Sequence, residues 1–485
     1  MLNQTPFLTA PGTMIPPVLV QIEISSRCNL KCKMCPLTLE TTLSSGDADG
    51  LMSDATWEQV ISMGKQAGTI IIAGFGEPLT NPDFRSMLRD LDDAKIEYSF
   101  STNGIGFEKF APELATLKYL KHVNISIDSP DPDIFMDIRG GDVNRALSGA
   151  RAIAAALQGK IMVTVAAVMM RSNAWSLVKF PAMLREMGIN YLVLSSLQAY
   201  REELDGEYVQ SNGAFTVLNN GQPSVSSDGA LEQIISECTK YGIHLMKSER
   251  VEMEAMTPVQ ANEKYFAEEK SGMTRACGVP FEHMYVDAAG RVFPCCQAAS
   301  GPVLGQVGPQ TLQEIWYGEP AKKFRNDILD AATTPEICRT CTIAPLGEHP
   351  LKMWSAEVTS SEYIPTGGIR LHVRNTGTMP WTGQFPLTIG SAKPLDRPSG
   401  RKTAFWRAPQ RITIMQQAQV LPGQEATLEF EMGPAVDGQE EFFQLVVEGK
   451  HWLWGTMHSY RPEATYYNGR IPEESLVPAL AGATR

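Results

Sequence analysis

The chain has 485 residues, of which 43% are hydrophobic and 20% are charged, and its formal net charge is −12. This length allows two to four domains with sizeable cores. An acidic balance without a run of lysines or arginines argues against a groove that follows nucleic-acid phosphates, so nucleic acid is not an expected partner. No basic residue precedes Arg27, and the longest apolar run, Ile161 to Met170, is too short for a bilayer. The sequence therefore predicts a cytoplasmic protein without a signal peptide or a membrane span.

Residues 1–17 contain four prolines and are predicted to form an extended lead-in. From residue 18 to 248, segments with strand periodicity alternate with segments of helical periodicity. The expected strands are 18–25, 69–73, 96–102, 122–128, 160–169 and 190–196, and the expected helices are 53–66, from 81, 112–120, 143–157 and 174–187. A helix over 230–240 and a short strand over 243–246 complete this region. The alternation predicts an α/β fold with a parallel sheet in a partial (βα)6 barrel of the TIM type. In such barrels the chemistry lies at the carboxyl ends of the strands.

Eight of the nine cysteines fall into tight groups, which in a reducing compartment favours metal over disulfides. Cys28, Cys32 and Cys35 follow the first strand with x3 and x2 spacing. So little chain between them does not suit pairwise disulfides, but it suits one multi-iron cluster. Three ligands leave one iron of a [4Fe–4S] cube open. A zinc knuckle and buried thiols without a metal are the alternatives.

The second group has Cys277-x17-Cys295 and, after 42 further residues, Cys338-x2-Cys341. Residues 284–293 between them are predicted to form a hairpin. Four cysteines on a hairpin and a knuckle are compatible with a zinc ribbon or with an iron–sulfur cluster. Cys238 stands alone and is expected to act as a small hydrophobic residue on a helix.

A C-x3-C-x2-C loop directly after a first strand resembles the radical S-adenosylmethionine (radical SAM) superfamily, in which the methionine part of SAM chelates the fourth iron. Met34 stands where the family usually has an aromatic residue. Gly74-Phe75-Gly76-Glu77-Pro78 resembles the family's Gly-Glu-Pro motif, which binds the amino group of SAM. The resemblance implies SAM contacts from Met34, Gly76, Glu77, Pro78, Ser101, Asn103, Ser126 and Arg139.

Two residues are candidates for the catalytic group that the resemblance leaves unassigned. Asp128 follows the fourth strand and could serve SAM or the substrate. Cys238 could donate a hydrogen atom if its helix faces the barrel. Helix caps at Ser126 and Asp128 and a solvated charge at Arg139 are the alternatives.

Residues 249–350 resemble the short form of the SPASM domain, called a twitch domain, which holds one auxiliary cluster. The resemblance implies the ligands Cys277, Cys295, Cys338 and Cys341, with Cys295 preferred over Cys296 because the x17 spacing matches. Four protein ligands would complete a second [4Fe–4S] cluster without an open iron, which suits electron transfer.

From residue 351 to 461 the periodicity changes to two, as in Ile369, Leu371 and Val373, and turns rich in Gly and Pro predict a C-terminal β-sandwich. Asn375 to Trp381 and the later Trp452-Leu453-Trp454 resemble an immunoglobulin-like four-tryptophan domain, which implies docking without a catalytic role. Core packing is the simpler explanation for most of these tryptophans. Residues 462–485 are predicted to form a tail.

Taken together, the resemblance implies an enzyme that cleaves SAM to a 5′-deoxyadenosyl radical and abstracts a hydrogen atom from a small hydroxylated substrate of the sugar or cyclitol type. Dehydrogenation or epimerisation would follow, with an external flavodoxin or ferredoxin as electron donor. The alternatives are modification of a peptide or protein held by the β-sandwich, and a non-enzymatic iron–sulfur scaffold.

An acidic cluster after the sixth strand is expected to be a solvated loop or, if it faces inward, a site for a cationic or polyhydroxyl substrate. It consists of Glu202, Glu203, Asp205 and Glu207.

Overall fold

The computed structural model describes residues 17–39, 50–157, 159–197, 204, 207, 229–247, 274–275, 277–298, 301–330, 332–339, 341, 346–347, 350–363, 369–392, 399, 402–404, 406–431, 441–453 and 458–460. Most of the predicted lead-in, the C-terminal tail and three members of the acidic cluster lie outside these residues. The domain boundaries expected at 248 and 461 also fall at or beside undescribed segments, and they stay predictions.

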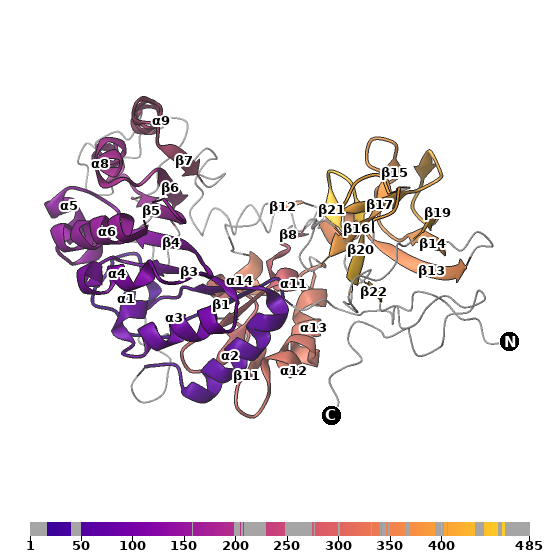
Figure 1. Ribbon diagram of the computed structural model, residues 1–485, viewed down its shortest axis with the longest axis horizontal. Coiled ribbons are helices and arrows are strands. Elements are labelled where there is room, and N and C mark those ends of the chain that lie inside the picture. The colour runs from indigo at the N-terminus through magenta and orange to yellow at the C-terminus, as the bar shows by residue number, and fades with distance from the viewer. Residues whose placement is uncertain are drawn as a thin grey trace.

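A ten-stranded sheet forms the larger part of the molecule (Figure 1). Its neighbours in order are β11, β10, β9, β1, β2, β3, β4, β5, β6 and β7, and every pair from β9–β1 to β6–β7 is parallel. The first seven strands in chain order are β1 (Leu19–Ile22), β2 (Thr69–Ile72), β3 (Glu97–Thr102), β4 (Leu120–Ser126), β5 (Met162–Met169), β6 (Tyr191–Ser196) and β7 (His244–Lys247). The predicted α/β fold with a parallel sheet is confirmed. The barrel is partial, because the free side of β1 pairs with β9 and not with the other end of the sheet.

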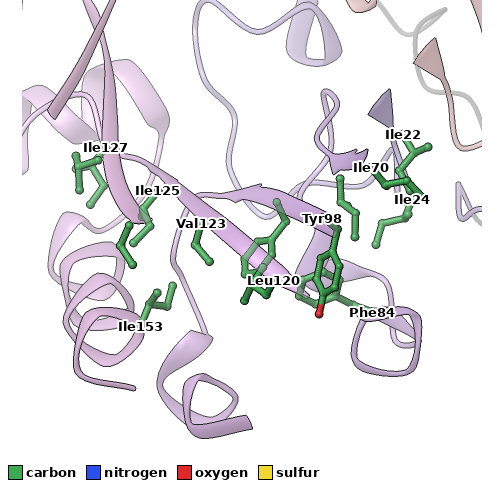
Figure 2. Packing of buried hydrophobic residues seen from close by; sticks show 14 of the residues in the cluster. Ile22, Ile24, Ile70, Phe84, Tyr98, Leu120, Val123, Ile125, Ile127 and Ile153 are labelled. Atoms are coloured by element: carbon green, nitrogen blue, oxygen red, sulfur yellow. The ribbon is translucent and has the colours of Figure 1, made fainter. Parts of the chain in front are cut away.

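One face of this sheet is covered by helices. The helices and 3-10 turns of the barrel region are α1 (Pro36–Leu39), α2 (Asp54–Ala67), η2 (Pro78–Thr80), α3 (Phe84–Asp93), η3 (Phe107–Lys109), α4 (Ala111–Leu114), α5 (Pro132–Arg139), α6 (Val143–Leu157), α7 (Ala174–Leu177), α8 (Phe180–Met187) and α9 (Ala230–Tyr241). Alternate strand residues such as Ile22, Ile70 and Val123 point into the core beneath the helices, where Phe84 and Ile153 meet them (Figure 2). Each fully buried side chain of this size contributes about 1.5–3 kcal/mol.

Three predicted helices differ from the observed ones. The helix expected from Asn81 begins at Phe84, and Asn81 instead follows the last residue of η2. The helix expected over 112–120 ends at Leu114, because β4 already begins at Leu120. The helix expected over 174–187 is divided into α7 and α8, and Pro181 lies in the first turn of α8. Proline is tolerated there because the first turn has no amide that needs an intrahelical acceptor.

The predicted auxiliary hairpin consists of β9 (His283–Val286) and β10 (Arg291–Phe293), with Gly290 at positive φ in the turn. β11 (Gly305–Gln306) pairs with β10, and β9 pairs with β1 in parallel, with Leu19 opposite His283. Around it lie β8 (Thr274–Arg275), α11 (Val279–Glu282), η6 (Cys296–Ala298), α12 (Leu312–Tyr317), α13 (Glu319–Asp327), α14 (Glu336–Arg339) and β12 (Leu346–Gly347). The auxiliary region therefore shares a sheet and a hydrophobic core with the barrel.

The C-terminal region has its own core between two antiparallel sheets. One sheet contains β13 (Ala356–Tyr363), β14 (Ile369–Asn375) and β19 (Glu425–Phe430), and the other contains β16 (Leu387–Ala392), β17 (Arg411–Ile414), β20 (Glu441–Val447), β21 (His451–Trp452) and β22 (His458–Tyr460). The smaller elements are α15 (Pro350–Met353), β15 (Trp381–Thr382) and β18 (Gln419–Val420). Trp354, Trp381 and Trp406 are buried in this core, as expected for structural tryptophans. No described helix has the length and apolar character needed to cross a membrane.

Candidate functional site

The cysteine triad lies in the loop after β1, held by the main chain at the end of α5. The amide of Lys31 donates to the carbonyl of Arg139 over 3.1 Å, and that of Lys33 donates to the carbonyl of Ile138 over 2.8 Å. None of the nine cysteines, all of which are described residues, forms a disulfide. Burial raises the pKa of Cys28 to about 11, with further contributions from Glu77 and from the thiolates of Cys32 and Cys35. Three neighbouring thiols, of which Cys32 is buried and the other two are half-buried, can deprotonate together only beside a compensating cation, which is what metal binding supplies.

The geometry fits a cluster better than a single ion. Within the described residues, no three His, Cys, Asp or Glu side chains converge closely enough to hold one metal ion. A cubane cluster places each thiolate on a different iron atom, so its ligands stand further apart than those of one zinc ion. The alternative of a zinc knuckle is therefore not supported, while the donor set fits a [4Fe–4S] cluster.

The loop after β2 lies directly against the cysteine loop. The amide of Glu77 donates to the carbonyl of Arg27 over 2.8 Å. A Cβ atom at Gly76 would lie 1.9 Å from the carbonyl oxygen of Ser25, so only glycine allows this approach. Pro78 is buried in the first turn of η2. The two loops thus form one surface at the carboxyl ends of β1 and β2.

Glu77 is buried within this surface. Its carboxylate accepts hydrogen bonds from the amide of Asn103 and the hydroxyl of Thr102, both over 2.7 Å, and from the amide of Leu79 over 3.3 Å. Asn103 also donates to Asn29 of the cysteine loop over 2.7 Å. Burial raises the pKa of Glu77, and it forms no ion pair within the part of the chain that the structure describes. A carboxylate has about four acceptor positions, so one remains for a cation such as the ammonium group of SAM.

Arg139 and Asp128 form a buried ion pair beside the triad. Arg139 Nε donates to Asp128 Oδ2 over 2.6 Å, and the side chains are 12% and 0% exposed. The other carboxylate oxygen accepts the amide of Val168 over 2.7 Å. The Arg139 guanidinium also donates to Cys32, and this contact lowers a thiol pKa that burial otherwise raises. Arg139 is therefore not a solvated charge. One carboxylate oxygen of Asp128 holds Arg139 and the other holds the amide of Val168, and a catalytic role for Asp128 stays a prediction.

The remaining predicted contacts are spread over the same edge of the sheet. Ser101 accepts from Asn124 over 3.3 Å, Ser126 is the last residue of β4, and Met34 packs against the core from the cysteine loop. Cys238 lies elsewhere. It is 3% exposed on the face of α9 that packs on the helix-covered side of the sheet, and burial raises its pKa to about 11. The condition on which its hydrogen-donor role depended, a helix facing into the barrel, is not met.

The second cysteine group gathers around the hairpin. Cys277 precedes α11, and burial together with the neighbouring Cys341 raises its pKa to about 11. Cys341 lies beside Cys338, whose carbonyl accepts its amide over 3.3 Å. Cys296 is half-buried, and burial together with Cys341 raises its pKa. Cys295 stays the predicted ligand. Because Cys296 lies close to Cys341, it remains the alternative ligand.

The buried side chain of Arg325 connects three helices of the auxiliary region. Arg325 donates to the carbonyls of Pro280 and Trp316, each over 2.8 Å, and its guanidinium stacks on the Trp316 ring at 4.0 Å. Burial lowers its pKa to about 10. Arg325 thereby joins α11, α12 and α13 around the predicted cluster.

Several polar residues near the site were not singled out from the sequence. Gln21 and Glu23 flank the buried Ile22 and point to the opposite face of the sheet, together with Tyr285 of the hairpin. The signal was present: a parallel strand covered on both faces is normally apolar throughout, and polar residues at alternate positions mark a functional face.

Within the acidic cluster, Glu207 faces inward, because it accepts from Lys33 over 2.9 Å and from the amide of Ser172 over 3.0 Å. For Glu207 the expectation of a solvated loop is wrong.

Two family models match the chain. Residues 22–180 match the radical SAM superfamily, and residues 277–342 match the iron–sulfur cluster-binding domain called SPASM. The first range contains the cysteine triad, and the second contains all four predicted auxiliary ligands.

Characterised relatives are similar over most of their length. The AdoMet-dependent heme synthase of Methanosarcina barkeri is 26% identical over 318 residues, which cover 64% of this chain and 84% of that protein. The PqqA peptide cyclase of Ruegeria pomeroyi is 24% identical over 348 residues, which cover 70% of this chain and 82% of that protein.

Two solved structures are also similar to this chain. SuiB of Streptococcus suis bound to S-adenosylmethionine matches with a TM-score of 0.46 at 17% identity, over 67% of this chain and 72% of SuiB. BtrN in complex with AdoMet and 2-DOIA matches with a TM-score of 0.31 at 15% identity, over 68% of this chain and 94% of BtrN. From the family matches and the site, the chain contains a radical SAM domain and a SPASM domain, which bind SAM with a [4Fe–4S] cluster and an auxiliary cluster.

Proposed function

We propose that this radical SAM enzyme abstracts a hydrogen atom from a small, polar, hydroxylated substrate bound on the face of the sheet opposite the helices. The observation that supports this substrate class is a hydrogen-bonded row of polar side chains across β3, β4 and β5. Asn124 donates to Ser101 over 3.3 Å and accepts from Thr164 over 2.7 Å, and Thr164 contacts His122 over 2.9 Å.

The register explains why these side chains share one face. Ser101 pairs with Asn124, and Asn124 pairs with Thr164. Their neighbours Phe100, Val123 and Val165 belong to the core beneath the helices, so the polar row points the other way. Ser101, Asn124 and His122 are half-buried, and burial lowers the pKa of His122, which favours the neutral imidazole. Such a surface offers both donors and acceptors to hydroxyl groups.

Bound to the reduced cluster, SAM supplies a 5′-deoxyadenosyl radical. In the proposed step a substrate C–H bond breaks and the C–H bond of 5′-deoxyadenosine forms. Dehydrogenation would further require a base that takes a proton from the substrate radical, and the auxiliary cluster, when bound, would supply an acceptor for one electron. Epimerisation would instead require a hydrogen-atom donor, such as a thiol, on the opposite face of the substrate. The electron that cleaves SAM comes from an external donor of the flavodoxin or ferredoxin type.

The test begins with reconstituted enzyme, SAM and dithionite under anaerobic conditions. Formation of 5′-deoxyadenosine, increased by a polyhydroxylated substrate, is expected. Absence of 5′-deoxyadenosine under every condition would rule out the radical class and favour the iron–sulfur scaffold. Replacing Asn124 with Leu should leave basal SAM cleavage intact but abolish the stimulation by substrate. Incorporation of solvent deuterium into the product would separate epimerisation from dehydrogenation.

A second candidate is radical modification of a peptide or protein. It is favoured by the similarity to a PqqA peptide cyclase over 70% of the chain. In this version the C-terminal β-sandwich, which we propose to be an immunoglobulin-like docking module, would hold the polypeptide. Its core shares no residue with the barrel core, so residues 351–485 can be deleted as a unit. Turnover of a small molecule should survive this deletion, whereas turnover of a docked polypeptide should collapse.

A further inference from the structure

Two side chains of β1 lie between the glycine loop and the auxiliary hairpin. Gln21 Nε2 donates to the carbonyl of Ala73, where the loop begins, over 2.9 Å, and Gln21 also hydrogen-bonds the Cys296 thiol. Two residues further along, Glu23 Oε2 accepts the amide of Phe75 over 2.5 Å and that of Gly76 over 3.4 Å. The same oxygen accepts the hydroxyl of Tyr285, on β9, over 3.3 Å.

We propose that Gln21, Glu23 and Tyr285 form a bridge through which the auxiliary hairpin positions the Gly74–Pro78 loop and thereby sets its affinity for SAM. This inference rests on the SAM-binding role proposed for that loop. The three residues are positioning residues, because Gln21 and Glu23 contact the backbone of the loop, Tyr285 contacts Glu23, and none of these contacts reaches the reacting atoms. The bridge makes SAM binding dependent on a hairpin that lies 262 residues away along the chain, as measured from Glu23 to Tyr285.

The contacts leave the loop little freedom to move. A Cβ atom at Gly74 would lie 2.4 Å from Glu23 Oε2 and 2.5 Å from Glu23 Cβ, so the loop backbone rests directly on this side chain. The hairpin is attached as firmly, because β9 pairs with β1 and the amide of Glu23 donates to the carbonyl of Val286 over 2.9 Å. A displacement of β9 must therefore move Tyr285 relative to Glu23, and Glu23 relative to the loop.

The electrostatics of Glu23 make the Tyr285 hydroxyl important. Glu23 is 3% exposed and forms no ion pair among the described residues, and Asp287 nearby is engaged with Arg291 over 2.7 Å. Burial and Asp287 raise the pKa of Glu23 to about 7, although its hydrogen bonds oppose this. A buried carboxylate without a cation depends on its donors, and these are two loop amides and one hairpin hydroxyl.

The experiment compares the full-length reconstituted protein with its Tyr285→Phe variant. Loss of one hydrogen bond to a carboxylate should weaken SAM binding about tenfold. It should also alter the change that SAM produces in the electron paramagnetic resonance spectrum of the reduced core cluster, while the iron content stays the same. Tyr317→Phe is the matched control. Tyr317 is another tyrosine of the auxiliary region, and its buried hydroxyl has no hydrogen-bond partner among the described residues.

A second pair of variants tests the same bridge from β1. Glu23→Gln keeps an acceptor for the loop amides and should bind SAM more tightly than Glu23→Ala, which removes it. The proposed bridge would be overturned if Tyr285→Phe bound SAM with wild-type affinity and showed an unchanged spectrum. It would also be overturned if Tyr317→Phe lost as much SAM affinity as Tyr285→Phe. If the wild-type spectrum does not respond to SAM at all, the SAM-binding role of the loop fails first. If the wild type responds and Tyr285→Phe responds identically, only the bridge fails.

Discussion

Replacing Gly76 with Ala should disrupt SAM binding, because it adds a methyl group where the glycine loop touches the cysteine loop. The new Cβ atom would lie 1.9 Å from the carbonyl oxygen of Ser25 and 2.8 Å from that of Arg27. Non-bonded carbon and oxygen atoms do not approach within 3.0 Å, so the loop must move by about 1 Å. The hydrogen bond from the Glu77 amide to Arg27, 2.8 Å long, is lost in that movement.

A misplacement of about 1 Å in a positioning element can cost on the order of 100-fold in rate, and the strain of overpacking costs about 1–3 kcal/mol of stability. The assay is 5′-deoxyadenosine formation with dithionite, together with equilibrium SAM binding and iron analysis. Gly383→Ala is the control, because its Cβ would meet nothing within 4 Å and its φ is not positive. If Gly76→Ala keeps wild-type SAM affinity and cleavage with full iron content, the loop is not the SAM-binding surface.

Four further predictions follow from single contacts. Cys277→Ser should lower the iron content from about eight to about four atoms per chain by colorimetric analysis, while SAM still perturbs the core cluster; an unchanged content would exclude Cys277 as a ligand. Asp128→Asn leaves a buried arginine without its carboxylate and should lower the free energy of unfolding by about 3–5 kcal/mol in urea titrations. Trp381→Ala removes a fully buried indole and should make the C-terminal sandwich more sensitive to limited proteolysis without changing SAM cleavage. Variant and wild type being cleaved at the same rate would contradict the place of Trp381 in the core. Burial raises the pKa of Glu23 in the folded state to about 7 from its ordinary value of 4.5, so the folded state keeps this proton longer and stability falls as pH rises between these values. The loss amounts to about 3 kcal/mol and should be absent in Glu23→Gln, as measured by urea midpoints at pH 4.5 and 7.

Local periodicity predicted most of the elements correctly. The alternation of Ile369, Leu371 and Val373 identified β14, and all three side chains are buried. The same reasoning for the first strand holds for Val20, Ile22 and Ile24 but fails for Val18, which is 41% exposed because β1 begins one residue later. The cysteine loop, the glycine loop and their position at the strand ends also follow from short motifs, because each is read within a few residues of the chain.

Contacts between distant segments could not be predicted in this way. The sequence indicated a hairpin over 284–293, but nothing in its periodicity shows that β9 pairs with β1. Likewise, Arg139 was identified as a candidate, whereas its partner Asp128 and its contact with Cys32 depend on how α5 packs over the cysteine loop. Side-chain partners of this kind are set by tertiary packing and leave no local signature.

The pairing of β9 with β1 changes what the auxiliary region does for the enzyme. An open parallel sheet leaves an edge strand with unpaired backbone groups, which is a site for misassembly. The hairpin covers that edge at β1, and it does so next to the two residues, Gln21 and Glu23, that support the glycine loop. A chain truncated at residue 248 would therefore lose more than a cluster. It would expose the edge of β1 and deprive Glu23 of the Tyr285 hydroxyl, so SAM binding should weaken even where only the core cluster is needed.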